Sequence, residues 1–429
     1  MAFKFESAVL KRLFRIFLVI LVFSIFFSYM YYNLDAKFKF FENLYKKPYS
    51  LRENVPINKS ITNYSDKLNE YYKIHNSMTK LNASMRKISF NECSNVGYGN
   101  RLYSLLTSIV IAILTNSSLV VRWKEIESYV DLPIRIFDNN FTLDQGLAKE
   151  VYETKSFKVK SLQSYIKTKQ MDTLMKTNVP EDALRYKYGG IGPHFMGLCS
   201  NPNYFSKLTY YNLVKNETIN LALEVISNNK STDIDKQEKI LKVGFEVGGN
   251  LLNRFWKPIK SIVNDVKFFF EKYFQNNFVI GLQIRLQFLN EQDTKKFIDC
   301  ALEIEREYLL SKNSSIKVNS FKWFIASDSQ NQINEILKTY TNKAFTANQY
   351  ALGHIRYGQQ GLYRTILDIK LLSLCNEIIV TGGSSFGWVA AMKSLKLPLY
   401  INGKNRSEKC LRSSLSNPPS REKYSSFRK

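Results

Sequence analysis

The chain has 429 residues, enough for two or three domains. Hydrophobic residues make up 45% of it and aromatic residues 14%, which excludes an intrinsically disordered protein. Five cysteines in this length exclude a small disulfide-rich scaffold. The formal net charge of +24 favours anionic partners, namely nucleic acid, an acidic membrane surface or phosphorylated small molecules, without choosing among them.

The N-terminal region has the pattern of a signal anchor. Residues 16–32 contain no charged side chain and follow the basic residues Lys4, Lys11, Arg12 and Arg15. As a helix this run is about 25 Å long, which suits the thin membranes of the early secretory pathway. A cleaved signal peptide is the alternative, but the run ends in tyrosines instead of a small-residue cleavage site. We therefore predict a cytosolic tail over residues 1–15 and an uncleaved transmembrane anchor over residues 16–32.

Residues 33–88 are polar and rich in Lys, Asn, Tyr and Ser, which is typical of a stem that holds a catalytic region away from a membrane. Asn-X-Ser/Thr sequons agree with lumenal exposure, although so Asn-rich a chain also produces some by chance. They lie at Asn58, Asn63, Asn82, Asn116, Asn140, Asn216, Asn229, Asn313 and Asn405. The five cysteines allow at most two disulfides, and Cys375, in an apolar segment, is expected to be a packed free thiol.

Beyond the stem, strand-like and helix-like segments alternate, which predicts an α/β architecture with parallel sheets. No long linker interrupts residues 89–403, although a weaker boundary falls near Lys257–Val263, where Pro258 precedes the next helix-like segment. Four segments in this region carry residues with a possible chemical role.

The first segment is a glycine-containing turn, Gly97–Arg101, before a long apolar stretch typical of a helix. Glycine there lets backbone N–H groups and the positive helix end approach an anion. A dinucleotide-binding oxidoreductase would need a third glycine where Leu102 stands, although Glu125 could mimic its ribose-binding acid. An ordinary strand-to-helix turn is the other alternative.

Two further segments are strand-like runs that end in a charged residue. Phe278–Arg285 has the apolar run of a buried parallel strand, in which Gln283 is expected to be a packing or network residue. Phe321–Ser329 carries Asp328 at the corresponding place. Ligands bind beyond the carboxyl ends of such strands, so Arg285 could hold a pyrophosphate and Asp328 a ribose or guanine. A surface arginine and a helix N-cap are the respective alternatives.

The fourth segment follows the strand-like run Glu377–Thr381 with a Gly-Gly turn and a helix that opens at Ser384 or Ser385. The glycines permit close backbone approach, and the serine hydroxyls and free N–H groups of the helix could hold a phosphate. A structural turn with serine as the N-cap is the alternative, with Phe386 a core residue.

Together, the four segments resemble the successive motifs of fucosyltransferases, most of all the xyloglucan-type α1,2-fucosyltransferases of plants and their relatives. The likeness covers residues 89–403. It implies a GT-B-like fold in which two Rossmann-like halves face a cleft. The N-terminal half would span residues 89–262 and the C-terminal GDP-sugar-binding half residues 263–403, followed by a basic tail over 404–429. It also implies a single-pass type II Golgi membrane protein whose catalytic region is lumenal.

The activity implied by the resemblance is inverting transfer of fucose from GDP-β-L-fucose to a glycan hydroxyl, with galactose O2 the expected position and no metal or other cofactor. Arg285 would be the catalytic residue that holds the β-phosphate and neutralises the departing GDP. Asn100 and Arg101 would approach the donor from the N-terminal half, and Asp328 would lie near the nucleoside. The remaining donor contacts would come from Ser384, Ser385, Phe386 and Gly387.

One departure from the family concerns histidine. Family members place a histidine ahead of the helix that leads into the Leu-Leu-Ser motif, whereas His354 lies farther away here. We expect the three histidines, His75, His194 and His354, to be exposed or packed rather than to act as a general base. Residues 139–250 match no motif, so the sequence does not assign the acceptor surface.

Other classes fit less well. Asp233-Ile234-Asp235 has the spacing of a metal-binding Asp-X-Asp motif, but its polar surroundings favour a solvated turn, and no His/Cys cluster has zinc spacing. Nucleic-acid binding would use the positive charge, yet no binding module is recognisable and a lumenal anchor excludes it. A catalytically silent, glycan-binding relative is the main alternative, and a transferase that uses another nucleotide sugar is a second. The sequence does not indicate an oligomeric state.

Overall fold

The computed structural model describes residues 65–81, 88–92, 96–138, 185–188, 192–227, 233–289, 291–310, 320–347, 350, 352, 358–401 and 410–413. All of them belong to one compact unit, Thr62–Lys429. The predicted anchor over residues 16–32 lies outside the described residues. Within the described ranges, no helix is both long and apolar enough to cross a membrane.

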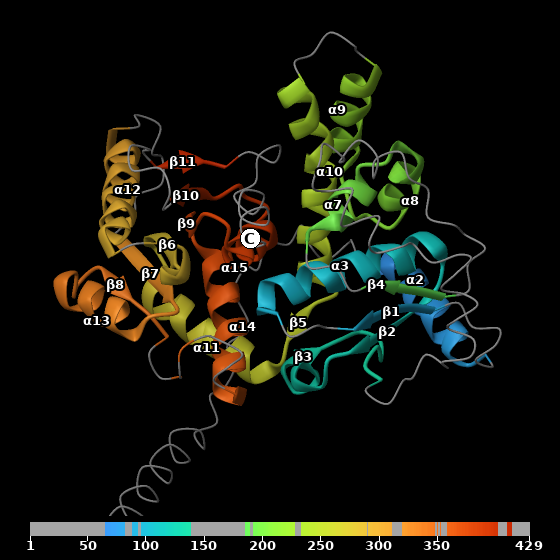
Figure 1. Cartoon of the computed structure of the whole chain (residues 1–429), viewed down its shortest axis with the longest axis horizontal. Helices are drawn as coiled ribbons and strands as arrows, with labels where there is room; N and C mark the ends of the chain where they lie inside the picture. The colour runs from blue at the N-terminus through green and yellow to red at the C-terminus, as the bar shows by residue number, and fades with distance from the viewer. Residues whose placement is uncertain are drawn as a thin grey trace, which may run out of the picture. The chain divides into compact units, whose positions relative to one another are not determined.

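The N-terminal half is built on a parallel sheet with the strand order β2-β1-β4 (Figure 1). These strands are β1 (Ile88–Glu92), β2 (Ser118–Arg122) and β4 (Arg185–Tyr188). Helix α3 (Tyr98–Thr115) connects β1 to β2, and each of its residues except Asn100 is buried. Its sequence is mainly apolar, and its polar residues Ser104, Thr107, Ser108 and Thr115 are buried too, as expected for a helix in the centre of a domain.

Further helices and short strands complete this half. They are α2 (Ser65–Thr79), η2 (Lys124–Tyr129), β3 (Val130–Asp131), α7 (His194–Cys199), η3 (Pro202–Tyr204), α8 (Phe205–Tyr210), α9 (Asn216–Ser227), α10 (Asp233–Arg254) and β5 (Lys257–Pro258). Helix α2 lies within the predicted stem, yet Leu68 and Tyr71 are buried in the core, so this part of the range belongs to the folded region. Asp233 and Asp235 lie in the first turn of α10, and the prediction of a solvated turn is therefore wrong about the backbone.

The C-terminal half is a six-stranded sheet with the order β11-β10-β9-β6-β7-β8. Its strands are β6 (Phe278–Ile284), β7 (Phe321–Ser327), β8 (Ala344–Phe345), β9 (Glu377–Thr381), β10 (Leu399–Ile401) and β11 (Leu411–Arg412). Only β11 among these runs antiparallel to its neighbour. Numbered by their sequence within this half, the strands follow the 3-2-1-4-5-6 order of a Rossmann sheet, as the α/β prediction requires.

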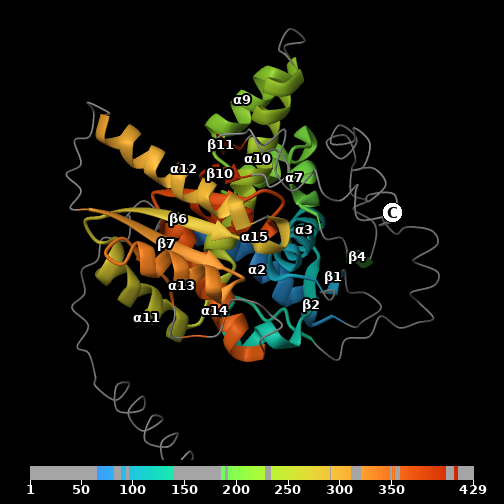
Figure 2. The same cartoon turned by 60° about the vertical axis from the view of Figure 1, so that its left-hand side comes forward.

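Helices cover both faces of this sheet (Figure 2). They are α11 (Lys260–Phe269), η4 (Phe270–Phe274), η5 (Leu286–Phe288), α12 (Glu291–Leu310), α13 (Gln330–Thr339), α14 (Gly358–Leu374) and α15 (Ser385–Ser394). Ile280, Leu282 and Ile284 of β6 pack with α12 and α13, whereas Val279 joins the cluster that contains α14. Burial on both faces explains why β6 is an uninterrupted apolar run instead of an alternating one.

The two halves share one continuous core. Helix α15 of the C-terminal half contacts both α3 and α10 of the N-terminal half. One hydrophobic cluster accordingly extends from Leu68 to Met392. Strand β5, which precedes the second half, pairs antiparallel with β3 of the first.

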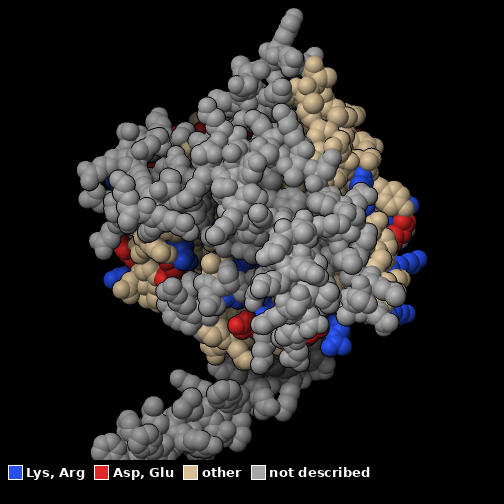
Figure 3. Space-filling view, turned by 45° about the vertical axis from the view of Figure 1, so that its right-hand side comes forward, with Lys and Arg blue, Asp and Glu red and all other residues tan. Residues whose placement is uncertain are grey.

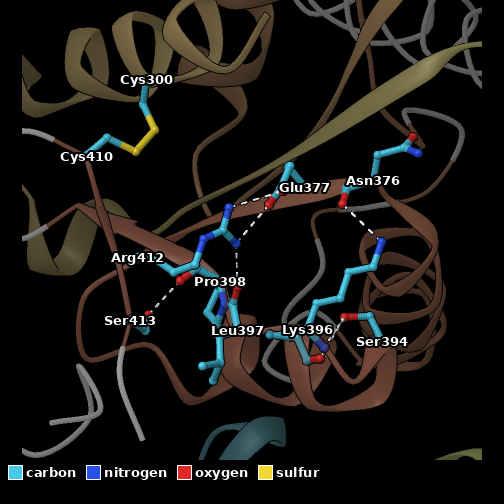
Figure 4. Close-up of polar contacts among 11 residues, drawn as sticks. Cys300, Asn376, Glu377, Ser394, Lys396, Leu397, Pro398, Cys410, Arg412 and Ser413 are labelled. Carbon is cyan, nitrogen blue, oxygen red and sulfur yellow. Dashed lines mark hydrogen bonds and ion pairs between the residues drawn. A yellow bond between two sulfur atoms is a disulfide. The ribbon is translucent and has the colours of Figure 1, made fainter. Parts of the chain in front are cut away.

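The outer edge of the C-terminal sheet is fastened by several contacts (Figure 4). A disulfide joins Cys300 of α12 to Cys410, which precedes β11. Arg412 donates two hydrogen bonds of 3.1 Å to the Glu377 carboxylate. Residues 410–413 lie in the range predicted as a C-terminal tail, but they form part of this sheet. Cys375 is buried and free, which confirms that prediction, and Cys199 is a second buried free thiol.

Candidate functional site

The candidate site lies at the topological switch point of the C-terminal sheet. β6 and β9 are neighbours in the sheet, but they are the first and fourth strands of this half, so the connections from them run to opposite sides. In open α/β sheets, ligands bind at the carboxyl ends of the strands where this reversal occurs. Arg285 follows β6 and Gly382–Ser385 follow β9, which brings two of the predicted segments to this point.

Arg285 is partly exposed, with 24% of its side-chain surface accessible. Its Nη2 donates to Gln287 Oε1 at 3.0 Å, and its Nε lies 3.8 Å from Asp328 Oδ2. The guanidinium also lies 5.9 Å from the ring centroid of Phe288. Nη1 has no partner among the described residues, so the guanidinium keeps donors available for an anionic ligand.

Asp328 follows β7 and faces Arg285. Its Oδ1 accepts a hydrogen bond of 3.0 Å from the backbone N–H of Leu286. Ser329, not Asp328, is the N-cap of α13, and its hydroxyl accepts from the Gln332 N–H. The alternative reading of Asp328 as a helix cap is therefore wrong, because both of its oxygens face the chain that follows β6.

The turn after β9 is held in a defined shape. The Gly382 N–H donates to the Ile401 carbonyl at 2.8 Å, and the Ser384 N–H donates to the Thr381 carbonyl at 3.1 Å. Gly383 has a φ of +80°, in the left-handed region where a side chain is strained. This turn delivers the chain into α15, with Gly387 buried against Val380 and Gln283.

Ser384 is the N-cap residue of α15, but its hydroxyl makes no capping hydrogen bond. The residue is 3% exposed, and its Oγ has no partner among the described residues. A buried hydroxyl without a partner costs about 1–3 kcal/mol, so its retention needs an explanation, and a bound ligand would supply the missing partner. The structure therefore disagrees with the alternative in which Ser384 merely caps the helix.

The N-termini of α3 and α15 meet beside this turn, and Figure 1 shows the two helices as neighbours. A Cβ at Gly99 would lie 2.7 Å from the backbone nitrogen of Phe386 and 2.7 Å from the Ser385 carbonyl carbon. The glycine motif of the first segment thus lets the two helix starts touch. Asn100 and Phe386 are half-buried at this junction. The positive ends of two helices accordingly lie beside each other, which favours an anion near this junction.

No protein-family model matches the sequence, and no curated protein matches it significantly. Among solved structures, an Arabidopsis thaliana FUT1 mutant in complex with GDP aligns with a TM-score of 0.53 and 14% identity over 86% of each chain. The fucosyltransferase NodZ from Bradyrhizobium aligns with a TM-score of 0.45 and 14% identity, over 76% of this chain and 99% of that one. POFUT1 in complex with GDP aligns with a TM-score of 0.33 and 11% identity, over 75% of this chain and 99% of that one.

The chain shares the fold of this FUT1 structure. The α/β architecture with parallel sheets, predicted from the sequence, is confirmed by the strand pairing.

Arg101 makes its described contacts within the N-terminal half. Its Nε donates to the Val96 carbonyl at 3.0 Å, and its guanidinium lies 5.3 Å from the Trp123 ring centroid. A longer ion pair of 3.7 Å reaches Glu125. These contacts fix the Gly97–Arg101 turn, and a direct role for Arg101 toward the donor remains a prediction.

The two described histidines are packed, as predicted. His75 is fully buried, and its Nδ1 accepts from the Leu119 N–H while Nε2 contacts the Arg135 carbonyl. Burial lowers the pKa of His194 to about 4, so its imidazole is neutral at physiological pH. His354 lies outside the described residues.

Within the described residues, no group of three or more His, Cys, Asp or Glu side chains could hold a metal ion. On the face drawn in Figure 3, the described Lys and Arg side chains lie in separate small groups, with acidic side chains beside some of them. This face therefore lacks a described basic stripe of the kind that follows a nucleic-acid backbone.

Sequence reasoning missed Thr381, the last residue of β9. Its side chain is fully buried. The hydroxyl accepts from the Arg285 N–H at 2.8 Å and donates to the Gln283 carbonyl at 3.0 Å. The prediction of Gln283 as a network residue is confirmed, since it is buried and its Oε1 accepts from the Thr381 N–H at 3.4 Å. The sequence feature that could have identified Thr381 is a hydroxyl-bearing residue directly before the Gly-Gly turn.

Proposed function

We propose that this protein transfers fucose from GDP-fucose to a glycan hydroxyl, with inversion and without a metal ion. The observation that carries this proposal is the placement of Arg285 and of the unpartnered Ser384 hydroxyl after neighbouring strands at the switch point of the C-terminal sheet. The fold supports it, because it is shared with an Arabidopsis FUT1 mutant whose structure contains GDP.

In the proposed reaction, the acceptor hydroxyl attacks the anomeric carbon of fucose as the bond to GDP breaks. Negative charge develops on the β-phosphate, and Arg285 stabilises it through the guanidinium donors that the protein leaves free. The Ser384 hydroxyl and the first N–H groups of α15 supply further donors on the other side of the switch point. Neither His75 nor His194 suits the role of general base, since both are buried, and the pKa of about 4 makes the His194 imidazole a weak base.

The proposal extends to location and acceptor. The predicted anchor over residues 16–32 would make the protein a type II membrane protein with its catalytic region in the Golgi lumen. The Cys300–Cys410 disulfide supports an oxidising compartment, because structural disulfides are rare in the cytosol. Asn116 and Asn216, each in a sequon, are exposed. Galactose O2 as the acceptor position, and hence an α1,2 linkage, follows from the sequence resemblance.

A donor screen tests the proposal. The purified region 40–429 would be offered GDP-fucose, GDP-mannose, UDP-galactose or UDP-glucose, with galactose-terminated acceptors and excess EDTA, while nucleotide release is measured. We expect turnover with GDP-fucose alone, undiminished by EDTA. GDP binding without transfer to any acceptor would favour a silent, glycan-binding relative, and turnover with another donor would refute the donor assignment.

Arg285→Ala tests the role of Arg285 in the same assay. It should abolish transfer and weaken GDP binding, while the midpoint of thermal unfolding, Tm, stays near the wild-type value, because a partly exposed strand-end arginine adds little to the core. A large fall in Tm with unchanged GDP affinity would show that Arg285 is structural.

A further inference from the structure

The chain that carries Arg285 leaves the sheet at a point where its backbone needs new partners. The paired residues of β6 end at Ile284, so the N–H groups of Arg285 and Leu286 lie beyond the β6–β7 and β6–β9 ladders. Both are nevertheless paired, and in each case the acceptor is a side chain. Thr381 Oγ1 accepts from Arg285 at 2.8 Å, and Asp328 Oδ1 accepts from Leu286 at 3.0 Å.

These two acceptors come from the strands on either side of β6. Thr381 ends β9 and Asp328 follows β7, so the chain after β6 is held from both neighbours in the sheet. The orientation of the Thr381 hydroxyl is fixed, because it also donates to the Gln283 carbonyl at 3.0 Å. The second oxygen of Asp328 lies 3.8 Å from Arg285 Nε and so biases the direction of the guanidinium.

We infer that Thr381 and Asp328 are positioning residues, which fix the backbone and side chain of Arg285 for the phosphate of the nucleotide sugar. The inference rests on the proposed function, because it assumes that Arg285 binds GDP. It changes the role predicted for Asp328, which acts here on Arg285 and not on the nucleoside. Near-ångström errors in the placement of such a group reduce turnover by about 100-fold, so the two side chains control catalysis without touching substrate.

Thr381→Val tests the first contact, because valine keeps the shape of threonine and removes the hydroxyl. We expect GDP affinity to fall by about 10-fold and transfer by about 10- to 100-fold. Thr381→Ser, which restores the hydroxyl, should recover both to within about threefold of wild type. Thr115→Val is the matched control. It removes another buried threonine hydroxyl, which donates to the Ile111 carbonyl at 2.7 Å at the opposite end of α3, and it should leave GDP affinity unchanged.

Asp328 is tested by a pair of variants. Asp328→Asn keeps an oxygen for the Leu286 N–H, whereas Asp328→Ala removes it. If Asp328 acts through this hydrogen bond, Asp328→Asn should keep GDP affinity within about threefold of wild type, and Asp328→Ala should lower it about 10-fold. The threefold range allows for the negative charge near the bound phosphates that asparagine also removes. A carboxylate that contacts the nucleoside predicts similar losses in both variants, and that result would overturn the role assigned to Asp328.

The decisive measurement combines Thr381→Val with Arg285→Ala, using the full-length protein in detergent and calorimetric titration of GDP. If Thr381 acts through Arg285, Thr381→Val should change GDP affinity less than about twofold once Arg285 is absent. An undiminished effect in that background would overturn the inference, as would wild-type affinity and turnover in Thr381→Val alone. Absence of GDP binding by the wild type would instead refute the proposed function and this inference with it.

Discussion

Replacing Gly99 by alanine tests whether the first glycine motif exists to let α3 and α15 touch. The new Cβ would lie 2.7 Å from backbone atoms of Ser385 and Phe386, which cannot rotate away as a side chain could. Ordinary contact begins near 3.4 Å, so the two helix starts must separate by about 0.7 Å. Overpacking of this kind costs about 1–3 kcal/mol, and the better helix propensity of alanine offsets at most about 1 kcal/mol. We expect a net loss of about 1–2 kcal/mol in the free energy of unfolding.

The assay is thermal unfolding together with the rate of fucose transfer. Gly99→Ala should lower Tm by a few degrees and slow transfer by about 10- to 100-fold, because the start of α15 moves relative to Arg285. Gly97→Ala is the control. No atom lies within 4 Å of its Cβ and its φ is −59°, so it should lose only the modest N-cap advantage of glycine. Wild-type behaviour of Gly99→Ala, or equal losses in both variants, would refute this reasoning.

Three further outcomes can be measured by equilibrium unfolding. Replacing both Cys300 and Cys410 by serine opens a loop with a sequence separation of 110, so stability should fall by up to about 5 kcal/mol, and reductant should then affect the wild type only. The pKa of His194 is lowered to about 4, below its unfolded value of about 6.5. The contribution of neutral His194 to the free energy of unfolding is therefore complete above about pH 6.5, and up to about 3 kcal/mol of it is lost as the pH falls toward 4. His194→Gln should flatten this part of the plot of stability against pH. Gly383→Ala should cost about 1–2 kcal/mol because its φ is +80°, whereas Gly383→Asn should cost less, and equal losses would contradict the strain argument.

The strands that position the site could be predicted from the sequence. Phe278–Ile284, Phe321–Ser327 and Glu377–Thr381 form β6, β7 and β9 with the expected ends, because strands buried on both faces are continuous apolar runs. The polar residues that interrupt those runs mark the carboxyl edge of the sheet. Arg285, Asp328 and Ser384 could therefore be selected before their positions were known.

The contacts among these residues could not be predicted in the same way. Asp328 is 42 residues from its partner Leu286, and Thr381 is 96 residues from Arg285. Such pairs depend on the order of strands in the sheet, which hydrophobic periodicity does not contain. Helix α2 was assigned to a stem for a related reason, since its polar composition hides the few residues, Leu68 and Tyr71 among them, that are buried in the core.

The fastening of β11 to the sheet also has a consequence for biosynthesis. Leu411 and Arg412 follow the other described strands of the C-terminal half in the sequence, yet they cover the outer edge of β10. An uncovered strand edge is a template for pairing with another chain. During translation that edge stays open until residues 410–413 emerge, so it is covered later than the other edges formed by the described strands. A truncation after residue 401 would leave the edge permanently open, and we would expect aggregation rather than a smaller soluble protein.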